Sequence, residues 1–373
     1  MPGAPLRLLV LAPSWVGDVA MATPALRLIR RSLPGCFIGG LVRPGIDALL
    51  GGSDFFDELH VERASGVLGP KFVAAKVRPR RYDTALLLTN SFSTALIVRL
   101  AGIPRRVGFD RDARGLLLTH RLDAPRRPGG GWAPISAVDY YLTAARALLE
   151  LSGVPPPTTP SGSIYLELAT TPTEEHAADD LLARARVAPG SPMVVLNPGA
   201  NDPAKRWPAD RFAALARHLD AAHGLTPLVN GSPAEAELVA SIVAAAPGSV
   251  ALPSHGVTLG SLKALLRRSR LLVTNDTGPR HVAAALGVPV VSLLGPTDHR
   301  WAIIPTRPGA PERTLLADPT LPPEEVANDH PDRCRIDRIT LARAVEAVEA
   351  LLGPPAPEVL RPAASAGRDD RAS

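Results

Sequence analysis

The chain has 373 residues, of which 46% are hydrophobic, carries a net charge of +5 and has an isoelectric point near 9.6. This length suits two domains, and the absence of any apolar run of roughly 18 to 20 residues excludes a membrane span, so we expect a cytoplasmic protein. The scattered arginines lack the interleaved aromatics of a nucleic-acid groove, so the positive charge fits a phosphorylated small molecule or an anionic membrane surface better than DNA.

In the first half of the chain, short apolar runs alternate with helical patterns, which predicts βαβ units and a parallel sheet. Strands are expected over residues 8–12, 36–42, 59–62, 84–88 and 106–109, and helices over 23–33 and 93–101. The two cysteines, Cys36 and Cys334, match no metal or redox spacing, so we expect both to be reduced.

The second half repeats this alternation and predicts a second sheet of the same kind. Proline- and glycine-rich segments between Asp123 and Pro160 flank the helical stretch AVDYYLTAARALLEL, so we predict domains over 1–160, with a linker helix, and 161–353. Residues 354–373 read as a disordered tail. Because ligands of open α/β sheets bind at the carboxyl ends of the strands, the site is expected between the domains.

The opening segment LAPSWVGDVAMATPAL carries an aspartate, Asp18, just after the first predicted strand. Thr23 and Pro24 form the better N-cap and first-turn pair, which leaves Asp18 in a loop or a short first turn. Its carboxylate is either a helix cap or a general base at the edge of the cleft. Sequence pattern alone does not separate these two readings.

A second segment, NPGANDPAKRWPADRF, follows a predicted strand and brings Gly199 to the cleft edge. Lys205 comes shortly after it, where an ammonium group can neutralise a leaving diphosphate. The alternative is a solvated basic pair, Lys205 and Arg206, with Trp207 packed as a wedge between the domains.

A third segment, LLVTNDTGPRHVAAALGVPVVSLLGPTD, ends a strand at Asp276, Thr277 and Gly278 and starts a helix at Pro279. The unpaired N–H groups at such a helix start, together with the helix dipole, form a diphosphate site. The alternative is that Asp276 or Thr277 only caps the helix. His281 follows one turn later, either facing the cleft or buried for structural reasons.

Two weaker signals for metal binding are present. Asp110-Arg111-Asp112 is an Asp-x-Asp tripeptide of the kind that elsewhere holds a divalent ion on a diphosphate, but it is common by chance. His330 and Cys334 have no further ligands nearby in sequence. We therefore expect no metal.

Four segments together resemble glycosyltransferase family 9, the ADP-heptose:lipopolysaccharide heptosyltransferases. They are PSWVGDVAMATPAL, the stretch 82–118 beginning YDTALLLTNS, NPGANDPAKRWP, and NDTGPRHVAAALGVPVVSLLGPTD. The resemblance implies a GT-B fold, in which two doubly wound Rossmann-like domains face a central cleft. The first domain would bind the acceptor and the second the sugar nucleotide.

The resemblance also implies a reaction: inverting, metal-independent transfer of L-glycero-D-manno-heptose from ADP-heptose to the lipopolysaccharide inner core, with no cofactor. The acceptor would be a lipid A–Kdo–heptose, to which the enzyme adds the second heptose. The enzyme would contact the cytoplasmic face of the inner membrane peripherally. Residues 302–338 keep only part of the family's pattern, so their role stays open.

Roles for individual residues follow from the matched motifs. Asp18 would be the base and Lys205 the group that stabilises the phosphates of ADP. The expected donor-binding residues are Gly199, Lys205, Glu237, Asp276, Thr277, Gly278 and His281. Glu235 competes with Glu237 for the ribose contact, and we favour Glu237. In the segment FDRDARG, Arg111 and Arg114 suit an anionic group of the acceptor.

Three other functions are weighed against this one. A GT-B transferase for another nucleotide sugar shares the same cleft, as does a UDP-sugar 2-epimerase, against which the PSWVGD segment argues. A non-catalytic sugar-nucleotide sensor or membrane-surface adaptor shares it too. Because pure binding needs no carboxylate at the acceptor position, the presence of both Asp18 and Lys205 favours catalysis.

Overall fold

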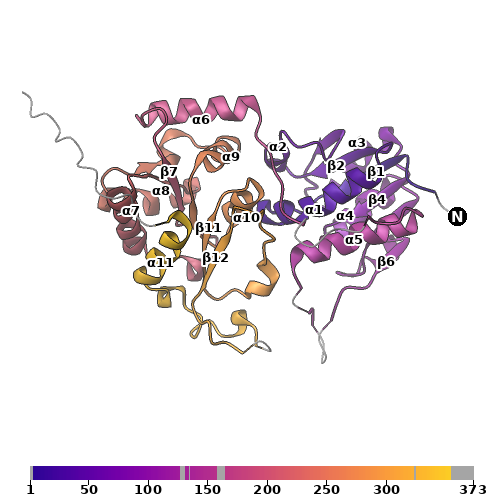
Figure 1. Ribbon diagram of the computed structural model, residues 1–373. Coiled ribbons are helices and arrows are strands. Elements are labelled where there is room, and N and C mark those ends of the chain that lie inside the picture. The colour runs from indigo at the N-terminus through magenta and orange to yellow at the C-terminus, as the bar shows by residue number, and fades with distance from the viewer. Residues whose placement is uncertain (1–2, 127–130, 134, 158–163, 323–324, 354–373) are drawn as a thin grey trace, which may run out of the picture.

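The computed structural model describes residues 3–126, 131–133, 135–157, 164–322 and 325–353, and in them two parallel six-stranded sheets lie side by side (Figure 1). The first has the order β3-β2-β1-β4-β5-β6 and the second β12-β11-β10-β7-β8-β9. The first sheet consists of β1 (Arg7–Leu11), β2 (Phe37–Val42), β3 (Glu58–Val61), β4 (Thr84–Leu87), β5 (Arg105–Phe109) and β6 (His120–Leu122). The second consists of β7 (Met193–Asn197), β8 (Thr226–Val229), β9 (Val250–Ala251), β10 (Leu272–Asn275), β11 (Val290–Leu294) and β12 (Glu312–Leu316).

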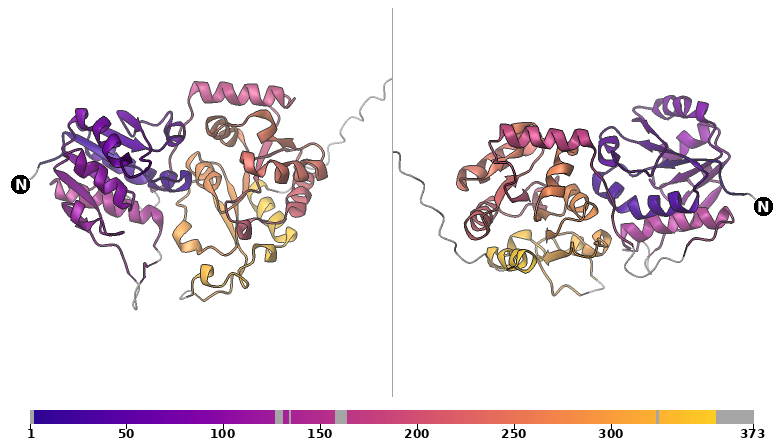
Figure 2. Two further views of the ribbon diagram at one scale, coloured as in Figure 1. Left: turned by 180° about the vertical axis from the view of Figure 1, so that it is seen from behind. Right: turned by 45° about the horizontal axis from the view of Figure 1, so that its top comes forward.

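Helices cover both faces of each sheet, as the views from behind and from above show (Figure 2). The first domain contains α1 (Val16–Ser32), α2 (Ile46–Leu50), α3 (Gly69–Val77), α4 (Phe92–Leu100) and α5 (Ala137–Leu151). The second contains α6 (Pro172–Arg184), α7 (Ala209–His223), α8 (Ala236–Ala245), α9 (Leu259–Arg268), α10 (Gly278–Ala285) and α11 (Leu341–Leu352). The predicted fold class, two doubly wound α/β sheets, is confirmed. None of the described helices combines the length and the apolar character that crossing a membrane requires.

The predicted division at residues 160 and 161 lies outside the described residues, as does the predicted tail 354–373. The strands of the first sheet lie within residues 7–122 and those of the second within 193–316. The helix predicted between them, α5, packs against α1 on the first sheet. Cys36 and Cys334 are both buried free thiols.

The strand order places two pairs of loops at the cleft. Each order reverses direction between two neighbouring strands, β1 and β4 in the first sheet and β7 and β10 in the second. The loops that leave such a pair at its carboxyl ends diverge to opposite faces and open a crevice. Asp18 and Asn90 follow β1 and β4, and Lys205 and Asp276 follow β7 and β10.

Helix α1 starts earlier than the sequence pattern suggested, at Val16 rather than near Thr23. The interpretation of Thr23 and Pro24 as cap and first-turn residues is therefore wrong, because both lie inside the helix. Pro24 has no N–H for the carbonyl of Ala20, and the Thr23 hydroxyl donates to that carbonyl instead, at 2.6 Å. This hydrogen bond allows the helix to continue through a proline and puts Asp18 in its first turn.

The two domains meet at two helix pairs. At one, α1 packs against α10. At the other, the buried ammonium group of Lys263 on α9 donates to the carbonyl oxygens of Ala48 and Gly51 at the end of α2, each at 3.0 Å. Glu174 on α6 neutralises this ammonium group at 3.0 Å. A buried charge with three oxygen partners ties the domains together at a defined point.

Candidate active site

A cavity of about 610 Å³ lies between the domains and receives residues from both. The first turn of α1 lines it with Trp15, Val16 and Gly17. From the second domain, the loops after β7, β8 and β10 contribute Gly199, Lys205, Glu235, Asp276, Thr277 and Gly278. Most of the residues predicted to meet the donor therefore do lie together, at the carboxyl edge of the second sheet. We refer to this space as the donor cavity.

Three asparagines hold the loops of the donor cavity, and the sequence analysis missed all of them. Asn275 donates to the carbonyl oxygens of Pro198 and Gly199 at 2.8 and 3.3 Å. Asn197 donates to the Thr277 hydroxyl at 3.0 Å and accepts a hydrogen bond from Asn230 at 2.7 Å. Each asparagine ends a strand or directly follows one. This shared position could have identified them from the sequence.

The start of α10 faces the donor cavity with unsatisfied backbone groups. Its N-cap residue, Thr277, makes no side-chain capping hydrogen bond, and Pro279 in the first turn has no N–H. The Arg280 N–H donates to the Thr277 carbonyl at 3.2 Å, so the Gly278 N–H and the helix dipole are what this end offers to an anion. The Lys205 ammonium group lies 3.8 Å from the Asp276 carboxylate, so a positive side chain stands beside the same helix terminus.

A smaller cavity of about 240 Å³ contains Asp18, and we refer to it as the acceptor cavity. Gly17 lines the donor cavity and the next residue, Asp18, lines the acceptor cavity, so the first turn of α1 borders both spaces. The other polar and aromatic lining residues are Asn90, Arg111, Trp132, Tyr140, Tyr141 and Trp301. Trp301 belongs to the second domain, so this cavity also draws on both halves of the chain.

The Asp18 carboxylate lies in the first turn of α1 and is not used as its cap. Burial raises its pKa above the ordinary value of 3.8. Among the described residues, no hydrogen bond or ion pair engages it, and the N-terminus of α1 has no side-chain cap. Its negative charge adds to the effect of burial in raising the pKa of the neighbouring Tyr141 phenol. A half-buried carboxylate without a partner, at the wall of a cleft, is typical of a functional group.

His281, which the sequence predicted to bind the donor, is not among the residues that line the donor cavity. It is buried between α10 and α1, with its ring against the backbone of Gly17. Burial, with the nearby Arg280 charge adding to it, lowers the pKa of the imidazole to about 3, so the ring is neutral at physiological pH. The residue therefore packs the two domains together, which was the structural reading of this position.

The two arginines predicted to bind the acceptor have different environments. Arg114 is fully buried, and its guanidinium donates to the carbonyl oxygens of Phe109 and Thr89. Burial lowers its pKa to about 10. Arg114 does not line the acceptor cavity, and its donors hold the loop that follows β5. Arg111 does line the acceptor cavity.

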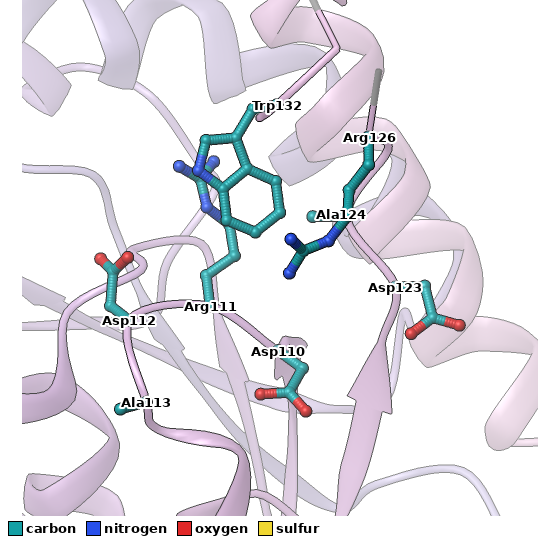
Figure 3. Close-up of a pocket in the computed structure, with 8 residues that line it drawn as sticks. All are labelled: Asp110, Arg111, Asp112, Ala113, Asp123, Ala124, Arg126 and Trp132. Atoms are coloured by element: carbon teal, nitrogen blue, oxygen red, sulfur yellow. The ribbon is translucent and has the colours of Figure 1, made fainter. Parts of the chain in front are cut away.

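Figure 3 shows how Arg111 is held at the rim of a further cavity of about 580 Å³. Its guanidinium carbon lies 4.0 Å from the ring centroid of Trp132, and that of Arg126 lies 4.5 Å from the same ring. Arg126 and Trp132 are also joined by an antiparallel bridge. Arg111 and Trp132 line both this outer cavity and the acceptor cavity, so the two spaces adjoin.

Of the two acidic candidates for the ribose contact, Glu235 lines the donor cavity and the favoured Glu237 does not. Glu235 lines the donor cavity, and its carboxylate accepts hydrogen bonds from the N–H and hydroxyl of Ser232, both at 2.8 Å. The carboxylate also lies over Gly199, where a Cβ would come 2.3 Å from Oε1. Glu237, two residues later on α8, is exposed and does not line the cavity.

Within the described residues, the grouping suited to a metal ion consists of His218, His223 and Glu349, whose ligand atoms lie within 4.8 Å of one another. It lies between α7 and α11, on the side of the second domain away from the first (Figure 1). The carboxylates of Asp110, Asp112 and Asp123 point in different directions (Figure 3). Asp110 lies 3.7 Å from Arg121.

Comparison with known proteins gives one consistent family. The model of glycosyltransferase family 9 (heptosyltransferase) matches residues 73–315. Lipopolysaccharide heptosyltransferase 2 of Salmonella typhimurium is 30% identical over 308 residues, which are 78% of this chain and 83% of that protein.

Two solved structures share the fold. A glycosyl transferase family 9 protein from Veillonella parvula superposes with a TM-score of 0.76 at 22% identity, over 94% of this chain and 98% of that one. The ADP-heptose lps heptosyltransferase II of E. coli gives a TM-score of 0.72 at 25% identity, over 93% and 98%. The chain belongs to glycosyltransferase family 9, the heptosyltransferases, and is a glycosyltransferase of GT-B architecture.

Proposed function

We propose that this protein transfers L-glycero-D-manno-heptose from ADP-heptose to the heptose of a lipid A–Kdo–heptose acceptor, as the second heptose of the lipopolysaccharide inner core. The names of the Salmonella typhimurium and E. coli relatives suggest this substrate class. The observation that carries the proposal is the first turn of α1, where Gly17 borders the donor cavity and Asp18 the acceptor cavity.

The donor cavity suits a sugar linked to a nucleoside diphosphate. The diphosphate would accept a hydrogen bond from the Gly278 N–H at the start of α10, beside the Lys205 ammonium group. Glu235 and Gly199 also line the cavity, and the ribose would lie beside them. Lys205 supplies a positive charge that the departing ADP needs more than the bound donor does.

The transfer would be a single displacement that inverts the anomeric carbon. The acceptor hydroxyl gives its proton to the Asp18 carboxylate, and its oxygen forms a bond to the anomeric carbon. The bond from that carbon to the diphosphate oxygen breaks, and the electron pair leaves with ADP. General-base help of this kind contributes roughly 10² to 10⁴ in rate. The α10 terminus and Lys205 stabilise the leaving phosphate, so neither a metal nor a cofactor is required.

The acceptor cavity fits an anionic carbohydrate. Arg111 offers a guanidinium there, and the aromatic rings of Trp132, Tyr140 and Trp301 offer flat surfaces for sugar rings. Guanidinium groups bind carboxylates and phosphates through paired hydrogen bonds. An inner-core acceptor carries such anionic groups next to the reacting heptose.

We also propose that the enzyme reaches its lipid-linked acceptor by peripheral contact with an anionic membrane through α3. Val67 and Phe72 are 96% and 62% exposed, and Leu68 beside them is exposed as well. Lys71, Arg78 and Arg81 are exposed in the same segment. Exposed apolar side chains among basic ones favour the surface of a membrane with anionic lipids.

Sedimentation with vesicles containing phosphatidylglycerol tests the membrane contact. We expect the wild-type protein to sediment with the vesicles and the double variant Lys71→Glu/Phe72→Ser to stay in solution. Ile303→Ser removes a comparable exposed side chain from the second domain and should leave binding unchanged. Equal binding by all three proteins would contradict a role for α3.

The transferase proposal is tested by ADP release from ADP-heptose with three acceptor conditions: none, a core without heptose, and a core with one heptose. Release that requires the one-heptose core, and that persists in EDTA, is the expected result. Release with the core that lacks heptose would show that the enzyme adds the first heptose instead. ADP binding without release under any condition would favour the non-catalytic alternative, and release from another nucleotide sugar would change the donor.

A further inference from the structure

Arg280 is a buried arginine next to the donor cavity. The transfer reaction described above assigns it no role. It is the third residue of α10 and is only 2% exposed. An arginine is almost never buried to this extent unless it is paired, because removing the guanidinium from water is costly. Its partners therefore indicate what it does.

The guanidinium joins the cavity to the sheet. Its Nη1 donates to Oδ1 of Asp276 at 3.1 Å, and its Nε donates to Oε1 of Glu312 at 2.7 Å. Ser292 lies 3.0 Å from the same Nε. The other oxygen of Asp276, Oδ2, lies 3.8 Å from the ammonium group of Lys205. Charges thus alternate along a row that runs from Glu312 through Arg280 and Asp276 to Lys205 at the cavity.

This row of charges explains how a carboxylate can lie next to the proposed diphosphate site. A carboxylate at Asp276, only 13% exposed, would repel the diphosphate proposed to bind at the same helix terminus. Arg280 compensates that charge from the buried side and occupies one carboxylate oxygen. The second oxygen is then left to face Lys205, whose positive charge stays at the cavity end of the row.

We infer that Arg280 is a positioning residue for donor binding: it orients the Asp276 carboxylate, and through it Lys205, toward the donor diphosphate. The inference rests on the proposed function, because it needs a nucleoside diphosphate in the donor cavity. A lysine would not replace Arg280, because the planar fork presents separate N–H groups to Asp276 and Glu312 in fixed directions.

The competing explanation is that Arg280 only anchors Glu312, the first residue of the edge strand β12, to the rest of the second sheet. Both explanations predict that Arg280→Met unfolds more easily, since it leaves the buried Glu312 carboxylate without its positive partner and with the Ser292 hydroxyl as its remaining donor. A second substitution separates them. In Arg280→Met/Glu312→Gln the unpaired buried charge is gone, while the contact with Asp276 is still missing.

The experiment compares wild type, Arg280→Met, Glu312→Gln and the double variant by thermal unfolding and by calorimetric titration with ADP. We expect the double variant to regain most of the stability that Arg280→Met loses, yet to keep a Kd for ADP raised about tenfold or more. Glu312→Gln, which retains the contact between Arg280 and Asp276, should bind ADP like wild type. In turnover, the KM for the donor should rise in the double variant while the KM for the acceptor stays the same.

The outcomes are distinct. Recovery of both stability and ADP affinity in the double variant would overturn the inference and leave Arg280 as a structural anchor. A rise in acceptor KM equal to that of the donor would also overturn it, because the effect would then be general. Failure of the wild-type protein itself to bind ADP would contradict the proposed function instead, since the variants are compared only against a binding wild type.

Discussion

The imidazole of His281 lies directly against the backbone of Gly17, so that a Cβ on Gly17 would come 2.7 Å from Cδ2 of the ring. This contact joins the first turn of α1, which carries Asp18, to α10, which forms the wall of the donor cavity. Only a glycine allows the two helices to approach this closely. The distance between the proposed base and the proposed diphosphate site therefore depends on one missing side chain.

Gly17→Ala is expected to weaken both stability and turnover. Alanine is better than glycine inside a helix by roughly 0.5–1 kcal/mol, so any loss must come from the contact with His281. Overpacking of this kind costs about 1–3 kcal/mol, measurable by denaturant unfolding. Gly278→Ala is the matched control for stability alone, since its Cβ would lie 3.3 Å from Val16 and requires only a small shift. His281→Ala in the Gly17→Ala background should recover part of the loss, and a loss that is unchanged there would contradict the explanation.

Asp18→Asn is expected to keep ADP affinity and to lose roughly 10² to 10⁴ in kcat. Because the base must be ionised and burial raises its pKa, kcat/KM of the wild type should be constant at higher pH and fall as pH drops through that raised value. The rate of ADP release, followed across pH, gives kcat and kcat/KM. Wild-type turnover in Asp18→Asn would remove the residue as the base.

Asp18→Asn, which is expected to lower turnover, is expected to raise the stability of the fold. A carboxylate whose pKa is higher in the folded than in the unfolded state stabilises the fold only when protonated, so at neutral pH its charge is a cost. Asp18→Asn should therefore raise Tm at pH 7, and the gain should shrink as pH falls through the raised pKa toward the ordinary value. A lower Tm at pH 7 would indicate that the carboxylate has a stabilising partner.

Lys205→Ala is expected to raise the Kd for ADP about tenfold, because a charge-assisted contact with phosphate is lost. Arg206→Gln is the matched control. The Arg206 guanidinium donates to the carbonyl of Ala200 at 2.9 Å, and glutamine removes the charge but keeps a donor. Calorimetry with ADP should separate the two variants. An equal loss of affinity in both would point to the charge of the whole loop rather than to the ammonium group of Lys205.

Much of the fold was predictable because it depends on local patterns. The alternation of apolar runs and helical segments identifies the two sheets, and the position of polar residues after strands brings Asp18, Lys205 and Asp276 to the cleft. The start of α1 was not predictable, because the hydrogen bond from Thr23 to Ala20 compensates for a proline that normally marks a helix start. Tertiary context overrides the local signal there.

The predicted site residues that do not line the cavities share one cause, since sequence shows which residue is near a site but not which way its side chain points. Glu235 and Glu237 are two residues apart, and the boundary between the short helical turn 233–235 and α8 decides which faces the cavity. His281 and Arg114 both lie next to the cleft in sequence, yet both are buried against backbone. Their roles depend on contacts with segments far along the chain.

Arg111 and Arg114, three residues apart, give a matched pair of variants. Arg111→Met is expected to raise the acceptor KM about tenfold while stability and donor KM stay the same, because its guanidinium faces the acceptor cavity. Arg114→Met should instead lower the free energy of unfolding by about 1–3 kcal/mol, since the buried carbonyl of Thr89 loses its donor and that of Phe109 keeps only the Arg111 N–H. Kinetics with varied acceptor and denaturant unfolding of both variants provide the measurement. If Arg114→Met folds normally and loses only acceptor affinity, the guanidinium of Arg114 must reach the acceptor in the working enzyme, and the division of roles between the two arginines would be reversed.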